Sequence, residues 1–132
     1  MQAKQYSQVV AEFVGGLKLS KIPPEVLEKA KFIVLDTLGV ALASSTMDFG
    51  HMVLEVARSL GGPMESTLFG TPHKVAAANA VLANATLAHG LDYDDTLEEA
   101  IVHTGCCGVT CALAVGSGTF LVSLPVRNFL PL

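Results

Sequence analysis

Alanine dominates one stretch of this chain, where seven of the residues from 76 to 88 are Ala. Alanine has the highest helix propensity of the amino acids, and its small side chain lets a second helix approach closely. We therefore predict a helix from Lys74 to about Gly90, packed at the centre of a helical bundle. Two asparagines lie within it, Asn79 and Asn84, and we expect their side chains to satisfy backbone groups or, alternatively, to line a polar pocket.

Four further segments have apolar residues at helical spacing, and glycine or proline stands at most of their ends. The short segment from Ser66 to Gly70 has a β-like composition instead. The predicted fold class is therefore all-α, a bundle of about five helices around one core. The four further helices are predicted over residues 5–17, 26–43, 49–60 and 105–116.

The composition excludes several classes of protein. Only 15% of the 132 residues are charged and 51% are hydrophobic, which argues against disorder, and the net charge of −4 provides no basic stripe for a nucleic acid. No apolar run approaches about 20 residues, and the N-terminus lacks the apolar core of a signal peptide, so we expect no membrane segment. The three cysteines are an odd number and lie between 106 and 111, which favours a reducing compartment over a disulfide framework. We expect a cytoplasmic protein.

The end of the chain differs in character from the rest. Residues 117–132 are apolar without a helical period, and Pro125 and Pro131 interrupt them. We therefore divide the chain into a helical domain over residues 1–116 and a divergent apolar tail of unknown structure over 117–132.

An acidic segment follows the alanine-rich helix, and no Lys or Arg occurs between residues 75 and 126. Neighbouring carboxylates raise one another's pKa values, so burying such a segment is costly without a counter-charge. Either the segment faces water, or it is neutralised by a metal, by a cation from elsewhere or by a partner chain. The segment contains His89, Asp92, Asp94, Asp95, Glu98, Glu99 and His103.

Three of these side chains suit proton transfer. Asp92 and Asp94 project to the same side if the chain between them is extended. Two such carboxylates can shuttle a proton or bind a substrate hydroxyl when one keeps the other protonated. His103 stands just before a predicted helix start and can act as a general acid or base near neutral pH, with a structural role as the alternative.

Other members of the segment fit structural roles. Asp95 and Glu98 have the spacing of a capping box, in which Asp95 would begin a helix and Glu98 would reach back to its first amide. His89 ends the alanine-rich helix and can cap its C-terminus. These roles require no chemistry.

A further alternative is that the segment binds a metal ion. The chain would then be an independent metal-binding domain. The cysteines lack C-x-x-C spacing, and Cys107 and Cys111 fit one helix face as small core residues. We therefore predict no metal. The two donor sets weighed are His89, Asp92, Asp94 and His103, or His103 with Cys106, Cys107 and Cys111.

The segment from His89 to Thr96, HGLDYDDT, followed by His103-Thr104-Gly105, resembles the H-x-L-D-[YF]-D-D-[TS]…H-P-[GS] signature of the MmgE/PrpD family. Upstream, Leu35 to Gly39 is similar to the family's LD-[TS]-hG helix, and Thr67 to Gly70 followed by the alanine-rich helix keeps the family's order. The resemblance extends roughly over residues 6–116. The family includes 2-methylcitrate dehydratase, cis-aconitate decarboxylase and iminodisuccinate epimerase.

The resemblance implies the N-terminal part of the family's helical domain and a cofactor-independent lyase or isomerase. The implied chemistry is proton transfer next to a carboxylate of a small di- or tricarboxylic acid, and dehydratase, decarboxylase and epimerase types stay open. His103 and Asp92 fall on positions implied to be catalytic, and Thr96 on one implied to bind substrate. We add Asp94 as a substrate-binding residue, because it is the second carboxylate of the pair.

The sequence departs from the family pattern at two points: Thr104 replaces the usual proline, and the interval from Thr96 to His103 is one residue longer. Family members are also much longer, with lysines and further histidines in a second domain. We therefore expect a truncated or frame-shifted product, or a chain with a foreign tail, that exposes apolar helix faces and forms a homo-oligomer. The alternative function is that of a catalytically inactive fragment that serves as a helical association module.

Overall fold

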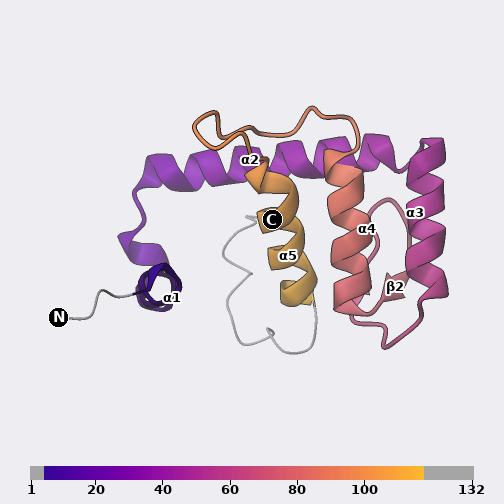
Figure 1. Cartoon of the computed structure of the whole chain (residues 1–132), viewed down its shortest axis with the longest axis horizontal. Coiled ribbons are helices and arrows are strands. Elements are labelled where there is room, and N and C mark those ends of the chain that lie inside the picture. The colour runs from indigo at the N-terminus through magenta and orange to yellow at the C-terminus, as the bar shows by residue number, and fades with distance from the viewer. Residues whose placement is uncertain (1–4, 118–132) are drawn as a thin grey trace. The chain divides into compact units, whose positions relative to one another are not determined.

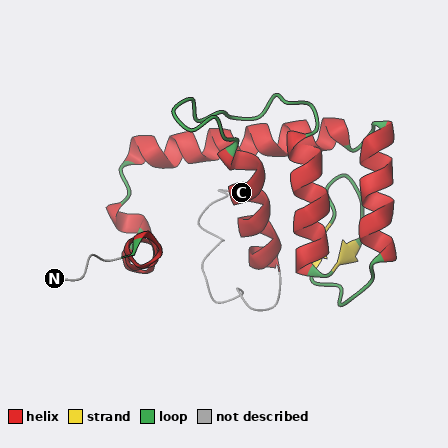
Figure 2. Ribbon diagram, viewed as in Figure 1, coloured by secondary structure: helices red, strands yellow, loops and turns green. Residues whose placement is uncertain are grey.

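The computed structural model describes residues 5–117, which form five α-helices, one short 3-10 helix and a two-stranded sheet (Figure 1, Figure 2). This confirms the predicted all-α class with about five helices, each within three residues of its predicted range. The tail predicted over residues 117–132 lies, beyond Ser117, outside the described residues. The helices are α1 (Tyr6–Gly16), α2 (Pro24–Ser44), α3 (Asp48–Ser59), α4 (Ala77–His89) and α5 (Thr104–Ser117).

The chain divides into two compact units, residues 1–31 and 32–132. In the first unit, α1 and the 3-10 helix Leu19–Lys21 precede the start of α2, which Pro24 and Glu25 favour because proline and acidic residues suit a first helical turn. Among the described residues, no single helix is long and apolar enough to cross a membrane. The sharply bent pair of α2 and α3 meets the length and composition criteria only when both helices are taken together.

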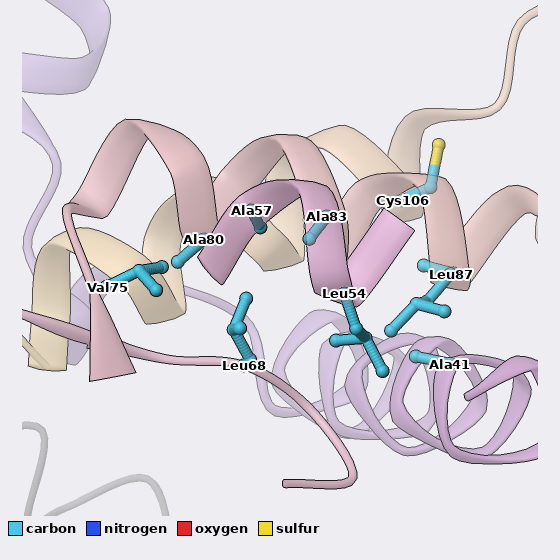
Figure 3. Close-up of a cluster of buried hydrophobic side chains, with 10 residues drawn as sticks. Ala41, Leu54, Ala57, Leu68, Val75, Ala80, Ala83, Leu87 and Cys106 are labelled. Atoms are coloured by element: carbon cyan, nitrogen blue, oxygen red, sulfur yellow. The ribbon is translucent and has the colours of Figure 1, made fainter. Parts of the chain in front are cut away.

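In the second unit, α4 packs against both α3 and α5 (Figure 1). Its buried face is made largely of alanine, which confirms the prediction of a closely packed central helix. Leu87 of α4, Leu54 of α3 and Ala41 of α2 lie in the same buried cluster (Figure 3). The full cluster comprises Ala41, Leu54, Ala57, Leu68, Val75, Ala80, Ala83, Leu87, Ala88 and Cys106.

The small sheet explains why α4 begins later than predicted. Strand β2 (Lys74–Val75) pairs antiparallel with β1 (Ser66–Thr67), so the two residues expected in the first turn of α4 have their backbone groups in a sheet. The helix then starts at Ala77, whose N–H donates to the carboxylate of Glu65 at 3.0 Å. A carboxylate stabilises a helix N-terminus because the first amides have no partner within the helix.

Asn84 fastens α4 to the segment that contains β1. Its side-chain oxygen accepts the N–H of Phe69 at 2.9 Å, and its side-chain nitrogen donates to the carbonyl of Thr67, also at 2.9 Å. Asn79 donates instead to the carbonyl of Gly61 at 3.1 Å. The prediction that both asparagines satisfy backbone groups is therefore confirmed.

Two glycines provide a matched test of packing. A Cβ at Gly50 would overlap the carbonyl oxygen of Ser44, where α3 follows closely on α2, whereas a Cβ at Gly39 would meet no atom within 4 Å. Gly50→Ala should lower the free energy of unfolding by about 1–3 kcal/mol through overpacking. Gly39→Ala should raise it by about 0.5–1 kcal/mol, because alanine favours an exposed helix. Urea denaturation followed by circular dichroism measures both, and equal shifts would contradict this packing.

Candidate functional site

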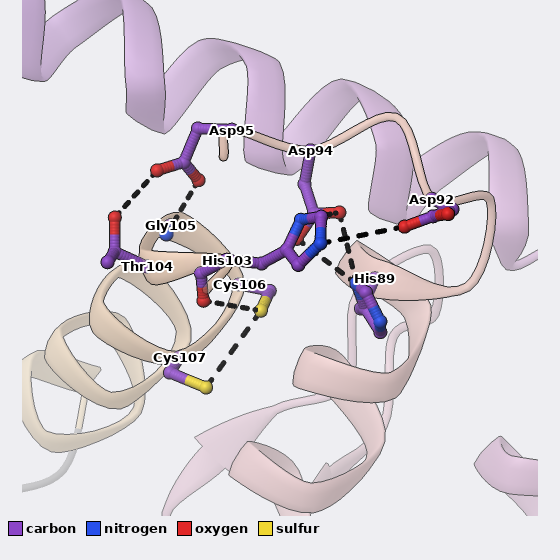
Figure 4. Close-up of polar contacts among 9 residues, drawn as sticks. All are labelled: His89, Asp92, Asp94, Asp95, His103, Thr104, Gly105, Cys106 and Cys107. Carbon is purple, nitrogen blue, oxygen red and sulfur yellow. Dashed lines mark hydrogen bonds and ion pairs between the residues drawn. The ribbon is translucent and has the colours of Figure 1, made fainter. Parts of the chain in front are cut away.

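Two helix ends and the loop between them bring four polar side chains together (Figure 4). His89 is the last residue of α4, and His103 directly precedes α5. The loop bends sharply at Asp92, whose φ of 55° is left-handed and whose N–H donates to the carbonyl of His89 at 2.9 Å. Aspartate tolerates this backbone region better than most residues. The chain is therefore not extended at Asp92, yet Asp92 and Asp94 both lie against His103.

Asp94 is the centre of this cluster. Its side chain is 0% exposed, and its Oδ1 lies 3.1 Å from Nδ1 of His89 and 3.2 Å from Nδ1 of His103. The two imidazole rings have centroids 4.7 Å apart. One buried carboxylate therefore faces two histidines from different helix ends.

Asp92 stands on the outer side of His103. Its Oδ1 lies 3.7 Å from Nε2 of His103, and its side chain is 80% exposed. The His103 ring consequently has one carboxylate near each of its nitrogens, a buried one at Nδ1 and an exposed one at Nε2.

The surroundings of Asp94 shift two pKa values in opposite directions. Burial alone would raise the pKa of Asp94, but the His89 and Cys106 side chains, together with a backbone hydrogen bond, favour the charged carboxylate, and the net effect is a lowered pKa. Burial, followed by the contact with Asp94, raises the pKa of Cys106 to about 12. Asp94 is therefore an anion and Cys106 a neutral thiol near neutral pH.

Asp95 caps a helix, but not the one predicted. In the described chain no helix begins at Asp95, so the capping box with Glu98 is wrong. Asp95 instead accepts the N–H of Gly105 at 2.7 Å and the hydroxyl of Thr104 at 2.6 Å, both in the first turn of α5. A Cβ at Gly105 would overlap the Asp95 carboxylate, so glycine leaves the space for this cap. The cap fixes the start of α5 directly after His103.

We expect Asp95→Ala to lower the free energy of unfolding by about 0.5–2 kcal/mol, the usual cost of losing a helix N-cap. Glu99→Ala is the matched control, because Glu99 is an exposed carboxylate of the same loop, and it should change stability by less than about 0.5 kcal/mol. Thermal unfolding measures both variants. A loss in Asp95→Ala no larger than in Glu99→Ala would show that the carboxylate does not hold the start of α5.

The structure brings together three of the four predicted site residues. His103, Asp92 and Asp94 lie in one cluster, whereas Thr96 is exposed, and within residues 5–117 its hydroxyl makes no hydrogen bond to them. His89, assigned to capping α4, points to Asp94 instead. This contact depends on the left-handed backbone at Asp92, which the spacing of the two residues does not reveal.

The same cluster contains the donors that could hold a metal ion. His89, Asp92, Asp94 and His103 each offer a ligand atom, and these atoms all lie within 4.8 Å of one another. The cysteines are arranged differently from the prediction: Cys106 is buried, whereas Cys107 and Cys111, expected in the core, are exposed. The reason is the rotation of α5, which turns Cys106 and Ala114 inward.

The sequence of this chain is similar to those of known proteins. The sequence model of the MmgE/PrpD N-terminal domain matches residues 8–119 of this chain. Cis-aconitate decarboxylase of Homo sapiens is 26% identical over 106 residues, which are 80% of this chain and 22% of that protein. The cis-aconitate decarboxylase of Aspergillus terreus is 23% identical over 95 residues, 72% of this chain and 19% of that protein. The chain thus spans about a fifth of the length of these curated relatives.

Proposed function

This chain belongs to the MmgE/PrpD family, and from that premise we propose that it acts as a lyase or isomerase on a small di- or tricarboxylic acid. The proposed reaction moves a proton at the carbon next to a carboxylate. The observation that supports it is the placement of His103 between Asp92 and Asp94, with each ring nitrogen near one carboxylate. No organic cofactor is proposed.

His103 is the proposed acid or base, acting through Nε2. The Asp94 anion beside Nδ1 favours the tautomer that has its proton on Nδ1, which leaves the lone pair of Nε2 available. Nε2 is also the nitrogen on the side of the exposed Asp92. The imidazolium formed when Nε2 takes a proton is stabilised by the two carboxylates.

Asp92 is the proposed second catalytic residue. Its carboxylate is 3.7 Å from Nε2 of His103 and exposed, so it can accept a hydrogen bond from a substrate hydroxyl or share the transferred proton. Thr96 is proposed to bind substrate from the same loop. For Asp94, substrate binding stays a prediction. Because its side chain is fully buried, its most direct influence on the reaction is through His103.

The charge of the site favours a particular arrangement around the substrate. A di- or tricarboxylate is a polyanion, and the cluster itself has two carboxylates with no Lys or Arg between residues 75 and 126. The substrate carboxylates and the carboxylates of the cluster repel each other, so cations from outside this stretch are required to bind the substrate. We propose that further chain, a second copy in a homo-oligomer or a bound ion supplies them.

The test is turnover by the purified chain of a panel of acids. Cis-aconitate comes first, because the curated relatives are named cis-aconitate decarboxylase; 2-methylcitrate and iminodisuccinate follow as substrates of the other reaction types. NMR of the reaction mixture identifies decarboxylation, dehydration or epimerisation. Turnover of one acid supports the proposal and assigns the reaction type. A folded chain that turns over none of them contradicts it.

Exposed apolar residues on α1 favour a second candidate function, a helical association module that pairs with another copy of the chain. Val10, Phe13 and Val14 are each at least 60% exposed on this helix. Apolar surface of this kind marks association sites. Light scattering of the purified chain tests the candidate: an oligomer without turnover favours it over the enzyme, and a monomer excludes it.

A further inference from the structure

We infer that His89, Asp92, Asp94 and His103 together form a binding site for one divalent transition-metal ion of the zinc type. The inference rests on donor geometry and charge, and binding does not depend on the proposed enzyme activity. Two imidazoles and two carboxylates are a donor set that zinc accepts in proteins. All four come from the second compact unit, from the end of α4 to the residue before α5 (Figure 4).

The spacing of the donor atoms matches the coordination sphere of such an ion. In a tetrahedral zinc site with bonds of about 2.0–2.2 Å, neighbouring ligand atoms lie about 3.3–3.6 Å apart. Oδ1 of Asp94 is 3.1 Å from Nδ1 of His89 and 3.2 Å from Nδ1 of His103. These two distances are close to two edges of the tetrahedron. The fourth donor, on the exposed Asp92, keeps all four ligand atoms within 4.8 Å of one another and can close by side-chain rotation.

One ring nitrogen of the cluster, Nδ1 of His103, lacks a hydrogen-bond partner within residues 5–117 and is free to coordinate a metal ion. Nδ1 of His103 is buried, and among the described residues it has no hydrogen-bond partner, although Oδ1 of Asp94 lies 3.2 Å away. A buried polar atom without a partner loses its hydration and gains nothing in return. Coordination of a metal ion would satisfy this nitrogen, and it requires the tautomer with the proton on Nε2, the opposite of the one proposed for proton transfer.

The charge of the cluster points to a divalent cation. The side chain of Asp94 is fully buried, and Asp92 adds a second carboxyl group nearby. No Lys or Arg occurs between residues 75 and 126. Two carboxylate ligands balance the charge of one divalent ion, since imidazole binds a metal through its uncharged form. The imidazole nitrogens favour a zinc-type ion over magnesium or calcium, which prefer oxygen ligands.

Metal binding has a consequence that does rest on the proposed function. A metal held by His103 occupies the ring that would transfer the proton, so the bound ion should inhibit turnover. Binding can be measured without any turnover, so a failure of the metal site and a failure of the proposed function are distinguishable.

The test titrates the metal-free chain with Co²⁺ and then with Zn²⁺. We expect the visible absorption of tetrahedral Co²⁺ to saturate at one equivalent per chain and to disappear on adding one equivalent of Zn²⁺. His89→Ala and Asp92→Asn should each weaken Co²⁺ binding by at least about 10-fold, since even the loss of an outer-shell partner costs that much. Circular dichroism checks each variant; should His89→Ala unfold, Asp92→Asn decides, because its side chain is exposed.

Two sets of controls separate this cluster from other donors. His51→Ala and His73→Ala remove exposed histidines elsewhere in the chain and should bind Co²⁺ as the unaltered chain does. Replacing Cys106, Cys107 and Cys111 together with Ser should leave the one-equivalent binding in place. The inference is overturned by absence of saturable binding, by full affinity in a folded His89→Ala or Asp92→Asn chain, or by loss of binding in the cysteine variant.

Discussion

Replacing His103 with Gln is expected to lower kcat by about 10²–10⁴-fold, the range that a positioned general acid or base contributes. Glutamine has a similar length and can still hydrogen-bond to the neighbouring carboxylates, but it cannot take up or release a proton near neutral pH. The measurement is steady-state kinetics on the acid that the unaltered chain turns over. A chelator in the assay keeps metal occupancy from contributing to the result.

His51→Gln is the control for this substitution, because His51 is an exposed histidine on α3. It should leave kcat and KM unchanged. The free energy of unfolding of both variants shows whether a loss of activity reflects chemistry or folding. If His103→Gln keeps the kcat of the unaltered chain, His103 is not the acid or base.

The largest expected loss of stability follows from Asn84→Ala. The substitution removes two hydrogen bonds of a side chain that is 1% exposed, and it leaves the N–H of Phe69 and the carbonyl of Thr67 without that partner. An unsatisfied buried group costs about 1–3 kcal/mol, so we expect the free energy of unfolding to fall by about 2–4 kcal/mol. Urea denaturation followed by circular dichroism gives the value.

Asn79→Ala offers the matched comparison on the same helix. Asn79 is half-buried and donates one hydrogen bond, to the carbonyl of Gly61, and that bond is exposed to solvent. Water can replace that bond, so the loss should stay near about 0.5–1 kcal/mol. Equal losses in the two variants would mean that Asn84 does not hold α4 to the strand segment.

Helix positions could be predicted because they depend on local sequence. Apolar spacing and the glycine or proline at most helix ends located all five helices within three residues. The start of α4 was the least accurate, because pairing between β1 and β2 takes up Lys74 and Val75. That pairing joins separate segments, and no local propensity encodes it.

The candidate site could be predicted only in part, for a similar reason. The sequence singled out Asp92, Asp94 and His103, and the structure places them in one cluster. The position of His89 depended on the left-handed turn at Asp92, which returns the chain toward the end of α4. Residue spacing does not encode such a turn.

The role of Asp95 also could not be predicted from residue spacing. The capping box predicted from its spacing to Glu98 is wrong, because Asp95 accepts the N–H of Gly105, ten residues along the chain. The loop from Leu97 to Val102 closes on itself through a bridge between those two residues, which returns the chain to Asp95. A cap made across a loop has no signature in a window of four residues.

Proton transfer at His103 is tested most directly by NMR of the reaction in D₂O, with cis-aconitate as the first substrate. If His103 exchanges its proton with solvent and delivers it to the reacting carbon, the product contains deuterium next to a carboxylate. We predict this incorporation for the unaltered chain, at a rate that His103→Gln lowers by about 10²–10⁴-fold. A product formed without deuterium, or equal rates of incorporation by the two chains, would contradict proton transfer by His103.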